Sequence, residues 1–240
     1  MEPIIDNQLV LPVSPPESYR FDDFVPGENQ QVVDYLQELV LAQDVSTHLC
    51  YLAGASGLGK THLLYAVSEL ANEQVGDHGV SAIYLDLNEL IAYSEESLLG
   101  LEQYQVVCID NVQAVETHKH WQQGIFDLIN RVLEVGHYLV FSATSMPKSL
   151  NIELRDLVSR LDWGVCFKLQ PLSDEQLVDA LVSKALAKGL KLPSEVASFL
   201  IKHYRRDMKS LVSVLELLDK RSLQTQRKLT IPFVKQALEL

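Results

Sequence analysis

The feature that most constrains this chain is the loop formed by residues 54–61, Gly-Ala-Ser-Gly-Leu-Gly-Lys-Thr. It fits the pattern G-x-x-x-x-G-K-[ST] of a phosphate-binding loop. Apolar residues 48–53 precede it as a predicted buried strand, and a helical period follows it. Glycines let backbone N–H groups turn toward an anion, and the next helix points its positive end at the same place. The alternative, a glycine-rich turn without a ligand, is disfavoured by this context.

The residues of this loop carry separate roles in the predicted site. Lys60 can reach the outer phosphate oxygens, and the Thr61 hydroxyl can ligate Mg²⁺. The imidazole of His62 is as well suited to a structural contact as to a ligand contact. The predicted nucleotide-binding residues of this region are Ser56, Gly57, Leu58, Gly59, Lys60, Thr61 and His62.

A second polar position follows a later apolar strand. Residues 106–109 are apolar, and Asp110 comes at the predicted carboxyl end of that strand. There its carboxylate would complete the Mg²⁺ shell opposite Thr61, although taken alone it could simply start a turn. The next residue is Asn111, where many ATP-hydrolysing proteins have a second acid. An amide cannot act as a base toward water, so we expect slow or absent ATP hydrolysis by this chain alone.

Composition limits the class of protein. The chain has 240 residues, of which 47% are hydrophobic and 22% charged, values typical of a globular protein with a sizeable core. No apolar run approaches the ~20 residues of a membrane helix, and no signal-peptide pattern is visible, so we expect a cytoplasmic protein that does not enter membranes. The formal charge of −12 argues against broad nonspecific DNA binding, but allows a basic patch around Arg205 and Arg206. The three cysteines lie in apolar segments and are expected to be buried thiols.

The chain divides into three regions. Residues 1–18 contain four prolines and no helical period, which predicts an extended tail. Residues 19–170 alternate strand and helix patterns, which predicts a parallel, doubly wound α/β sheet. Residues 171–240 show only helical patterns and open with a capping box from Ser173 to Gln176. The five predicted strands are residues 48–53, 80–87, 105–109, 138–143 and 164–169.

Three segments together resemble one protein family. Residues 19–29, Tyr-Arg-Phe-Asp-Asp-Phe-Val-Pro-Gly-Glu-Asn, resemble the segment that opens the AAA+ domain of the replication initiator DnaA. Residues 109–113 resemble its Walker B strand, and residues 159–164, Ser-Arg-Leu-Asp-Trp-Gly, resemble its arginine-finger box. From Tyr19 onward the chain is therefore identified as a member of the DnaA/Hda family. The resemblance implies an AAA+ base with a five-stranded parallel sheet, followed by a small all-helical lid.

The resemblance also implies partners. Residues 8–13, Gln-Leu-Val-Leu-Pro-Val, resemble the sliding-clamp-binding motif of this family, with Gln8, Leu9, Leu11 and Pro12 as contacts. Two leucines on an extended segment would enter an apolar pocket, and Pro12 would lower the ordering cost. The alternative is a Pro/Leu tail exposed to solvent. Arg160 is implied to act in trans as an arginine finger on ATP bound to DnaA, rather than as a helix-end residue paired with Asp156 or Asp162.

Further site residues follow from the same resemblance. Thr144 occupies the sensor 1 position, and Lys209 occupies sensor 2, where the family usually has Arg. Met208 could pack against a nucleotide or in the core, whereas Trp163 is expected to pack. Val25, Pro26 and Asn29 match the segment that lines the base pocket.

The predicted function is thus an ADP-Mg²⁺-bound regulator of replication initiation that meets DnaA-ATP at the DNA-loaded clamp and is able to self-associate. The alternatives are a self-contained P-loop ATPase or small kinase, and a DnaA-like AAA+ loader that contacts DNA.

Overall fold

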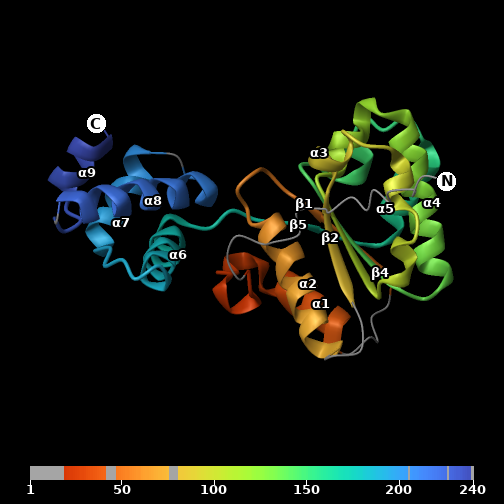
Figure 1. Cartoon of the computed structure of the whole chain (residues 1–240), viewed down its shortest axis with the longest axis horizontal. Coiled ribbons are helices and arrows are strands. Elements are labelled where there is room, and N and C mark those ends of the chain that lie inside the picture. The colour runs from red at the N-terminus through yellow and green to blue at the C-terminus, as the bar shows by residue number, and fades with distance from the viewer. Residues whose placement is uncertain (1–18, 42–46, 76–80, 205, 226, 239–240) are drawn as a thin grey trace, which may run out of the picture.

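The computed structural model describes residues 19–41, 47–75, 81–204, 206–225 and 227–238. It consists of an α/β base and a smaller helical lid, drawn at opposite ends of the long axis in Figure 1. Both parts agree with the predicted fold class.

The base is built on one sheet of five parallel strands in the order β2-β3-β4-β1-β5. Each predicted strand is present, with its ends within two residues of the prediction, and β4 matches at both ends. Since the strands are parallel, all their carboxyl ends meet at one edge of the sheet. The strands are β1 (Leu49–Ala53), β2 (Ala82–Asp86), β3 (Val106–Asp110), β4 (Tyr138–Ala143) and β5 (Val165–Lys168).

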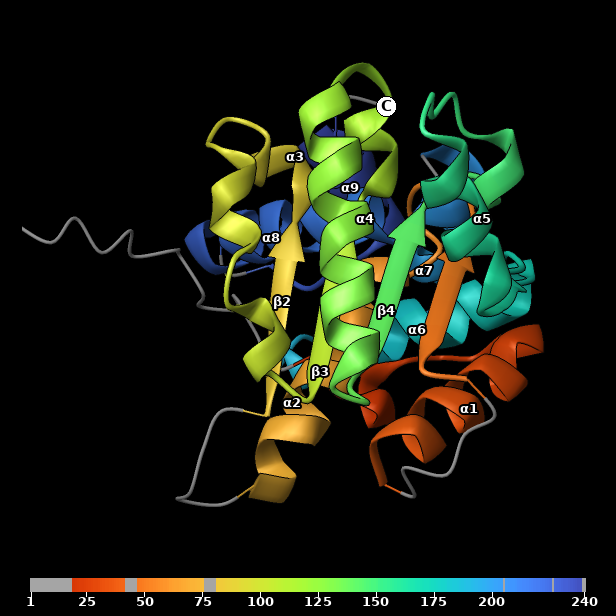
Figure 2. The same ribbon diagram turned by 90° about the vertical axis from the view of Figure 1, so that its right-hand side faces the viewer.

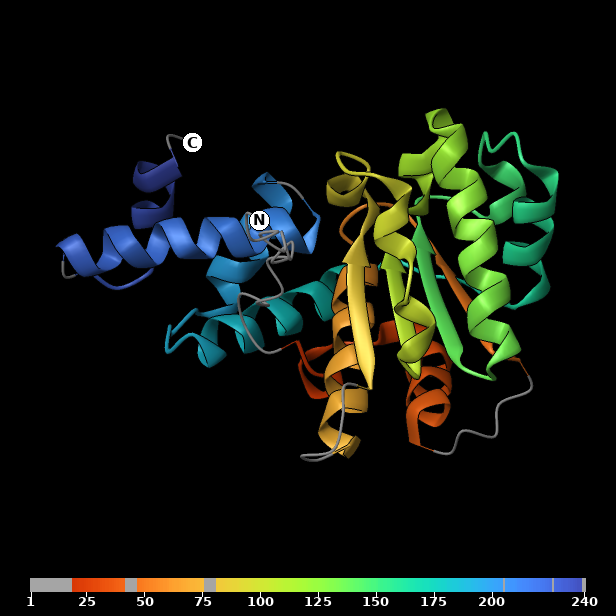
Figure 3. The same ribbon diagram turned by 45° about the vertical axis from the view of Figure 1, so that its right-hand side comes forward.

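Helices cover both faces of this sheet. Alternate residues of the buried strands point to opposite sides, so that Leu49 and Tyr51 enter one core while Cys50 and Leu52 enter the other. The first core lies under α4 and α5, and the second lies under α1 and α2. Figure 2 views the sheet from the α4 side, and Figure 3 shows the layers obliquely. The base helices are α1 (Gln30–Leu41), α2 (Lys60–Val75), α3 (Leu87–Leu90), α4 (Lys119–Glu134) and α5 (Arg155–Trp163).

Short 3-10 helices connect these elements. They matter to the site because several of them follow strand ends or precede long helices. They are η1 (Phe21–Asp23), η2 (Gly27–Asn29), η4 (Glu95–Leu98), η5 (Leu101–Gln103), η6 (Val112–Thr117) and η7 (Pro147–Ser149).

The lid has a hydrophobic core of its own. Its first helix begins at the predicted capping box: the Ser173 side chain accepts from the Gln176 backbone N–H, and the Gln176 side chain accepts from the Ser173 N–H. These reciprocal bonds satisfy two N–H groups that the first turn would leave unpaired. The lid helices are α6 (Asp174–Ala187), α7 (Ser194–His203), α8 (Met208–Thr225) and α9 (Ile231–Leu238).

Two further expectations from the sequence concern the burial of the cysteines and the presence of membrane-spanning helices. Cys50 and Cys108 are fully buried as expected, but Cys166 on β5 is only half-buried. Among the helices that the structure describes, none combines the length and apolar character needed to cross a bilayer.

Candidate nucleotide-binding site

The loop of residues 54–61 joins β1 to α2 at the carboxyl edge of the sheet. Gly57 and Gly59 have φ angles of 85° and 90°, a left-handed conformation that glycine adopts without a steric penalty. The loop is also closely packed from two sides. A Cβ on Gly59 would lie 2.6 Å from the Phe24 ring, and a Cβ on Gly57 would lie 2.6 Å from the Asp207 Cβ. The opening segment and the lid residue that directly precedes α8 therefore both touch the loop.

Lys60 is held at the base of this loop. It is only 7% exposed, and its Nζ donates to the carbonyl oxygens of Gly54 at 2.7 Å and Ala55 at 2.9 Å. Burial lowers the pKa of the Lys60 ammonium, and the charge of Asp110 opposes this shift. The ammonium thus lies on the inner side of the loop, where a phosphate would replace the carbonyls as its partner.

Asp110 is fully buried at the end of β3 and accepts hydrogen bonds on both carboxylate oxygens. Its Oδ2 accepts from the Thr61 hydroxyl at 2.5 Å and from the Tyr84 hydroxyl at 3.0 Å. Its Oδ1 accepts from the Asn111 N–H at 2.9 Å and from the Ser142 hydroxyl. Mg²⁺ prefers hard oxygen ligands from one or two side chains, supplemented by phosphate and water. The adjacent Thr61 and Asp110 oxygens fit this requirement.

Asn111 joins a chain of polar contacts beside Asp110. Its backbone is left-handed, with φ 62°. The side-chain Nδ2 donates to Asp86 Oδ1 at 2.8 Å, and Oδ1 accepts from Gln113 Nε2 at 3.0 Å. Gln113 Oε1 accepts in turn from the backbone N–H of Thr144, which directly follows β4, at 3.2 Å. The structure thus connects Asn111 to Thr144, but the Asn111 side chain is committed to protein partners.

The opening segment packs against α2 through His62. The His62 ring is 8% exposed, and its Nε2 lies 2.8 Å from the Arg20 carbonyl oxygen, to which it can donate. The rings of Tyr19 and Phe24 lie beside it, with centroids 5.0 and 5.5 Å away. Burial lowers the pKa of the His62 imidazole. Of the two roles considered for His62, these contacts favour the structural one.

Asn29 connects this segment to Gln170, the last residue of the base before the lid. Its Nδ2 donates to the carbonyls of Pro26 at 3.0 Å and Gln170 at 2.9 Å, and its Oδ1 accepts from the Gln170 N–H at 2.7 Å. The Asn29 side chain therefore bridges two backbone segments. Val25 and Pro26 are half-buried beside it, and their contact with a base stays a prediction.

The lid residues predicted for the site begin α8. Met208 is its first residue and packs partly against the lid core, which favours the packing alternative. Lys209 is the second residue, but its side chain lies outside what the structure describes. Ser56 is exposed on the loop and Leu58 is half-buried.

Arg160 lies toward the amino edge of the sheet, whereas this loop lies at its carboxyl edge. It is exposed in the last turn of α5, which leads directly into β5. A Cβ on Gly164 would lie 2.3 Å from the Leu49 carbonyl oxygen, so this end of α5 packs at the amino end of β1. Within the described part of the chain, Arg160 has no ion pair or hydrogen bond. Asp162, one of its two candidate partners, instead pairs with Lys148 at 2.6 Å.

Trp163, which is expected to pack, instead lies largely at the surface. It is 60% exposed and lines a shallow hollow of about 250 Å³ together with Phe126, Asp156, Ser159 and Arg160. The reason is its place at the end of α5: Leu157 and Leu161 form the buried stripe of this short helix, and Trp163 lies off that stripe.

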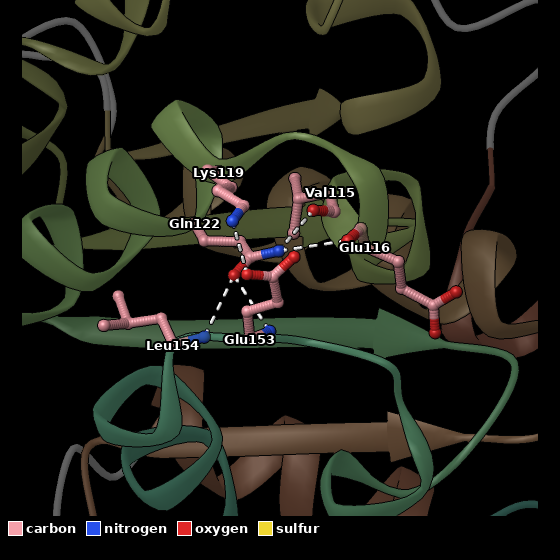
Figure 4. A network of polar contacts seen from close by, with 6 residues as sticks. All are labelled: Val115, Glu116, Lys119, Gln122, Glu153 and Leu154. Atoms are coloured by element: carbon pink, nitrogen blue, oxygen red, sulfur yellow. Dashed lines mark hydrogen bonds and ion pairs between the residues drawn. The ribbon is translucent and has the colours of Figure 1, made fainter.

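A buried amide fixes the segment that precedes α5. Gln122 on α4 is 1% exposed and makes four hydrogen bonds, shown in Figure 4. Its Nε2 donates to the carbonyls of Val115 and Glu116 at 2.9 and 3.1 Å. Its Oε1 accepts from the N–H groups of Glu153 and Leu154, both at 3.1 Å. This amide thus ties η6, which follows Asn111, to the start of the arginine-bearing helix.

Some residues of the site were not predicted from the sequence. Tyr84 and Asp86 reach the site from β2, and their positions depend on the pairing of β2 with β3, in which Asp86 lies opposite Asp110. A strand-ending Asp on β2 is the one sequence signal that could have indicated this. The predicted clamp-binding residues Gln8, Leu9, Leu11 and Pro12 lie outside the described residues.

Comparison with known structures agrees with this fold. Domain III of the replication initiation protein DnaA from Thermotoga maritima is 22% identical, with a TM-score of 0.81 over 95% of this chain and 98% of that chain. AMPPCP-bound DnaA from Aquifex aeolicus is 21% identical, with a TM-score of 0.70 over 84% of this chain and 65% of that one. The Thermotoga maritima RuvB Holliday junction branch migration motor is 15% identical, with a TM-score of 0.71 over 92% of this chain and 71% of that one. At these identities the likeness shows a shared fold.

Family matches cover most of the chain. Residues 174–238 match the lid domain of Hda. Residues 16–168, well over half of the chain, match the bacterial DnaA ATPase domain. The chain therefore belongs to the DnaA/Hda family of AAA+ proteins, as its sequence motifs indicated.

Proposed function

We propose that this chain is a nucleotide-bound regulator of replication initiation. In this proposal it holds ADP and Mg²⁺ in its own site and docks through residues 8–12 on a sliding clamp loaded on DNA. It then supplies Arg160 to ATP held by DnaA and stimulates hydrolysis, which converts the initiator to its ADP form and prevents re-initiation.

The observation that carries the proposal is the placement of Arg160. Its guanidinium is exposed and has no ion pair or hydrogen bond with a described residue. The end of α5 packs at the amino end of β1, whereas the chain's own phosphate loop follows the carboxyl end of that strand. A five-residue strand separates these two ends by roughly 15 Å. This separation favours action on a nucleotide held by another molecule.

The chemistry of such a residue is electrostatic. A guanidinium aimed at the γ-phosphoryl oxygens stabilises the charge that develops on them in the transition state. Arginine fingers contribute about 10³–10⁵ in rate, or about 4–7 kcal/mol. Arg160 has the required exposure, and Trp163 and Phe126 beside it offer apolar surface to a partner.

The chain's own site is suited to holding a nucleotide rather than consuming it. The loop amides and Lys60 would bind the phosphates, and Thr61 and Asp110 would hold Mg²⁺, which when bound neutralises phosphate charge. The position after Asp110 carries an amide that is engaged with Asp86 and Gln113. This arrangement supports a structural nucleotide and disfavours the alternative of a self-contained ATPase or kinase.

The decisive experiment measures hydrolysis of DnaA-bound ATP with and without this chain, in the presence of clamp-loaded DNA and ADP. We expect strong stimulation by the unaltered chain and a loss of about 10³-fold or more with Arg160→Ala. The matched control is Arg155→Ala, which removes an exposed arginine from the other end of the same helix. Full stimulation by Arg160→Ala would refute the proposal, as would equal losses for both variants.

The clamp-docking part is tested separately. A pull-down on immobilised clamp should retain the unaltered chain and should lose it on Gln8→Ala or Leu11→Ala. The Arg160→Ala variant should still be retained, because the two contacts are on different parts of the chain. Retention of the tail variants would remove clamp docking from the proposal and leave the role of Arg160 open to its own assay.

A further inference from the structure

The strongest unexplained feature of the site is a tyrosine hydroxyl on the predicted metal carboxylate. Tyr84 is on β2, opposite Cys108 in the strand register and therefore on the same sheet face as Asp110. Its hydroxyl donates to Asp110 Oδ2 at 3.0 Å. The same oxygen accepts from the Thr61 hydroxyl at 2.5 Å. Two hydroxyls from two different elements thus converge on one carboxylate oxygen.

The Tyr84 ring is held firmly enough to fix the direction of its hydroxyl. The ring is half-buried between β2 and α2 and stacks on Tyr65, with centroids 3.9 Å apart and planes inclined by 23°. Tyr65 is one helical turn after Thr61 on α2, and Tyr19 also stacks on Tyr65, with ring centroids 5.2 Å apart. The stack is therefore built on the same helix that presents the Thr61 hydroxyl.

We propose that Tyr84 is a positioning residue for Mg²⁺ bound with the nucleotide. Its hydroxyl holds the Asp110 carboxylate with Oδ2 turned toward Thr61, while Ser142 and the Asn111 N–H hold Oδ1. Residues that hydrogen-bond a metal ligand without touching the metal orient that ligand. Their removal typically weakens metal binding about 10- to 100-fold. The inference rests on the nucleotide-holding part of the proposed function and is independent of the clamp and of DnaA.

The test compares the unaltered full chain with Tyr84→Phe, which keeps the ring and the stack and removes only the hydroxyl. Binding of a fluorescent ADP analogue is measured in EDTA and across a Mg²⁺ titration. We expect equal affinities in EDTA, and a Mg²⁺ concentration for half-maximal effect that is about 10- to 100-fold higher for Tyr84→Phe. The matched control is Tyr35→Phe, because its hydroxyl donates to the carbonyl of Thr47, which lies just before the amino end of β1 and away from Asp110. This control should titrate like the unaltered chain.

The other possible results distinguish a wrong assignment of Tyr84 from a wrong proposed function. An unchanged Mg²⁺ titration for Tyr84→Phe would overturn the assignment and leave the proposed function intact. An equal loss of affinity with and without Mg²⁺ would make Tyr84 merely structural, and would also overturn it. Failure of the unaltered chain to bind ADP under any condition would instead remove the nucleotide from the proposed function, and the assignment with it. Circular dichroism of each variant without nucleotide establishes that folded proteins are compared, with the assay run in the cold if a variant melts early.

Discussion

Asn111, which directly follows the strand-ending Asp110, is held in place by its neighbours on both sides of its amide group. Its amide group has one donor side and one acceptor side, and both are used: Nδ2 donates to Asp86, and Oδ1 accepts from Gln113. A carboxylate would have no donor and would face Asp86 with a like charge. The left-handed backbone at this position also suits Asn. The amide is therefore built into the site, and restoring an acid there has a structural cost.

We expect Asn111→Asp to lower the free energy of unfolding by about 1–3 kcal/mol at neutral pH, because one hydrogen bond becomes a charge repulsion. Asp86→Asn alone should cost less, since Asn111 can still donate to its oxygen. The double variant should recover much of the loss, because the new amide at 86 can donate to the new carboxylate at 111.

Urea unfolding of all four proteins forms a double-mutant cycle that measures this coupling. Additive losses in the double variant would show that the contact between Asp86 and Asn111 carries no energy. The same cycle at Gln113 would show how far the coupling extends toward Thr144.

At the scale of elements, local patterns predicted the strands, the phosphate loop and the capping box of α6, because each depends on residues close in sequence. The site residues that depend on strand pairing could not be predicted this way. Tyr84 reaches Asp110 only because β2 pairs with β3 in one register, and no local pattern sets that register. Trp163 was expected to pack but is largely exposed, because its exposure depends on where α5 ends against the sheet. The fold could thus be predicted from the sequence, but the contacts between residues of different helices and strands could not.

One buried amide joins η6 to the segment that directly precedes α5. Gln122 uses two donors and two acceptor directions to join η6 to residues 153 and 154. Such fully satisfied polar contacts fix one arrangement, because any half-satisfied alternative leaves buried groups unpaired. Gln122 therefore sets where the arginine-bearing helix begins.

Gln122→Glu should lower the free energy of unfolding by at least about 3 kcal/mol at neutral pH. The new carboxylate keeps the acceptors but loses both donors, and it places an unpaired charge in the core beside two carbonyls. Gln123→Glu is the matched control, since Gln123 is exposed and bonds only Asp127. It should cost less than about 0.5 kcal/mol in the same urea titration. Equal losses for both variants would show that the Gln122 contacts do not hold the segment in place.

At the scale of the whole molecule, charge and packing both divide the chain between base and lid. Residues 1–170 carry 8 basic and 24 acidic side chains, whereas residues 171–240 carry 12 basic and 8 acidic ones. The lid also has its own hydrophobic core, separate from the two cores that flank the sheet. The described contacts between the parts include the approach of Leu172 to Gly27 and of Asp207 to the phosphate loop. The Asn29 side chain holds Gln170, the last residue of the base before the lid. A nucleotide between the loop and α8 would add a further connection.

This division predicts how the molecule unfolds. Without nucleotide, calorimetry should resolve two overlapping transitions, because each part can lose its own core. Saturating ADP and Mg²⁺ should merge them and, at 100 times the dissociation constant, should add about 2.7 kcal/mol of stability. Asn29→Ala should separate the two transitions further, since it releases Gln170, the residue that leads directly into the lid, whereas Asn151→Ala at an exposed position should not. A single transition in the unaltered chain without ADP, unchanged by Asn29→Ala, would mean that base and lid form one cooperative unit whose coupling depends on packing beyond the contacts of Asn29.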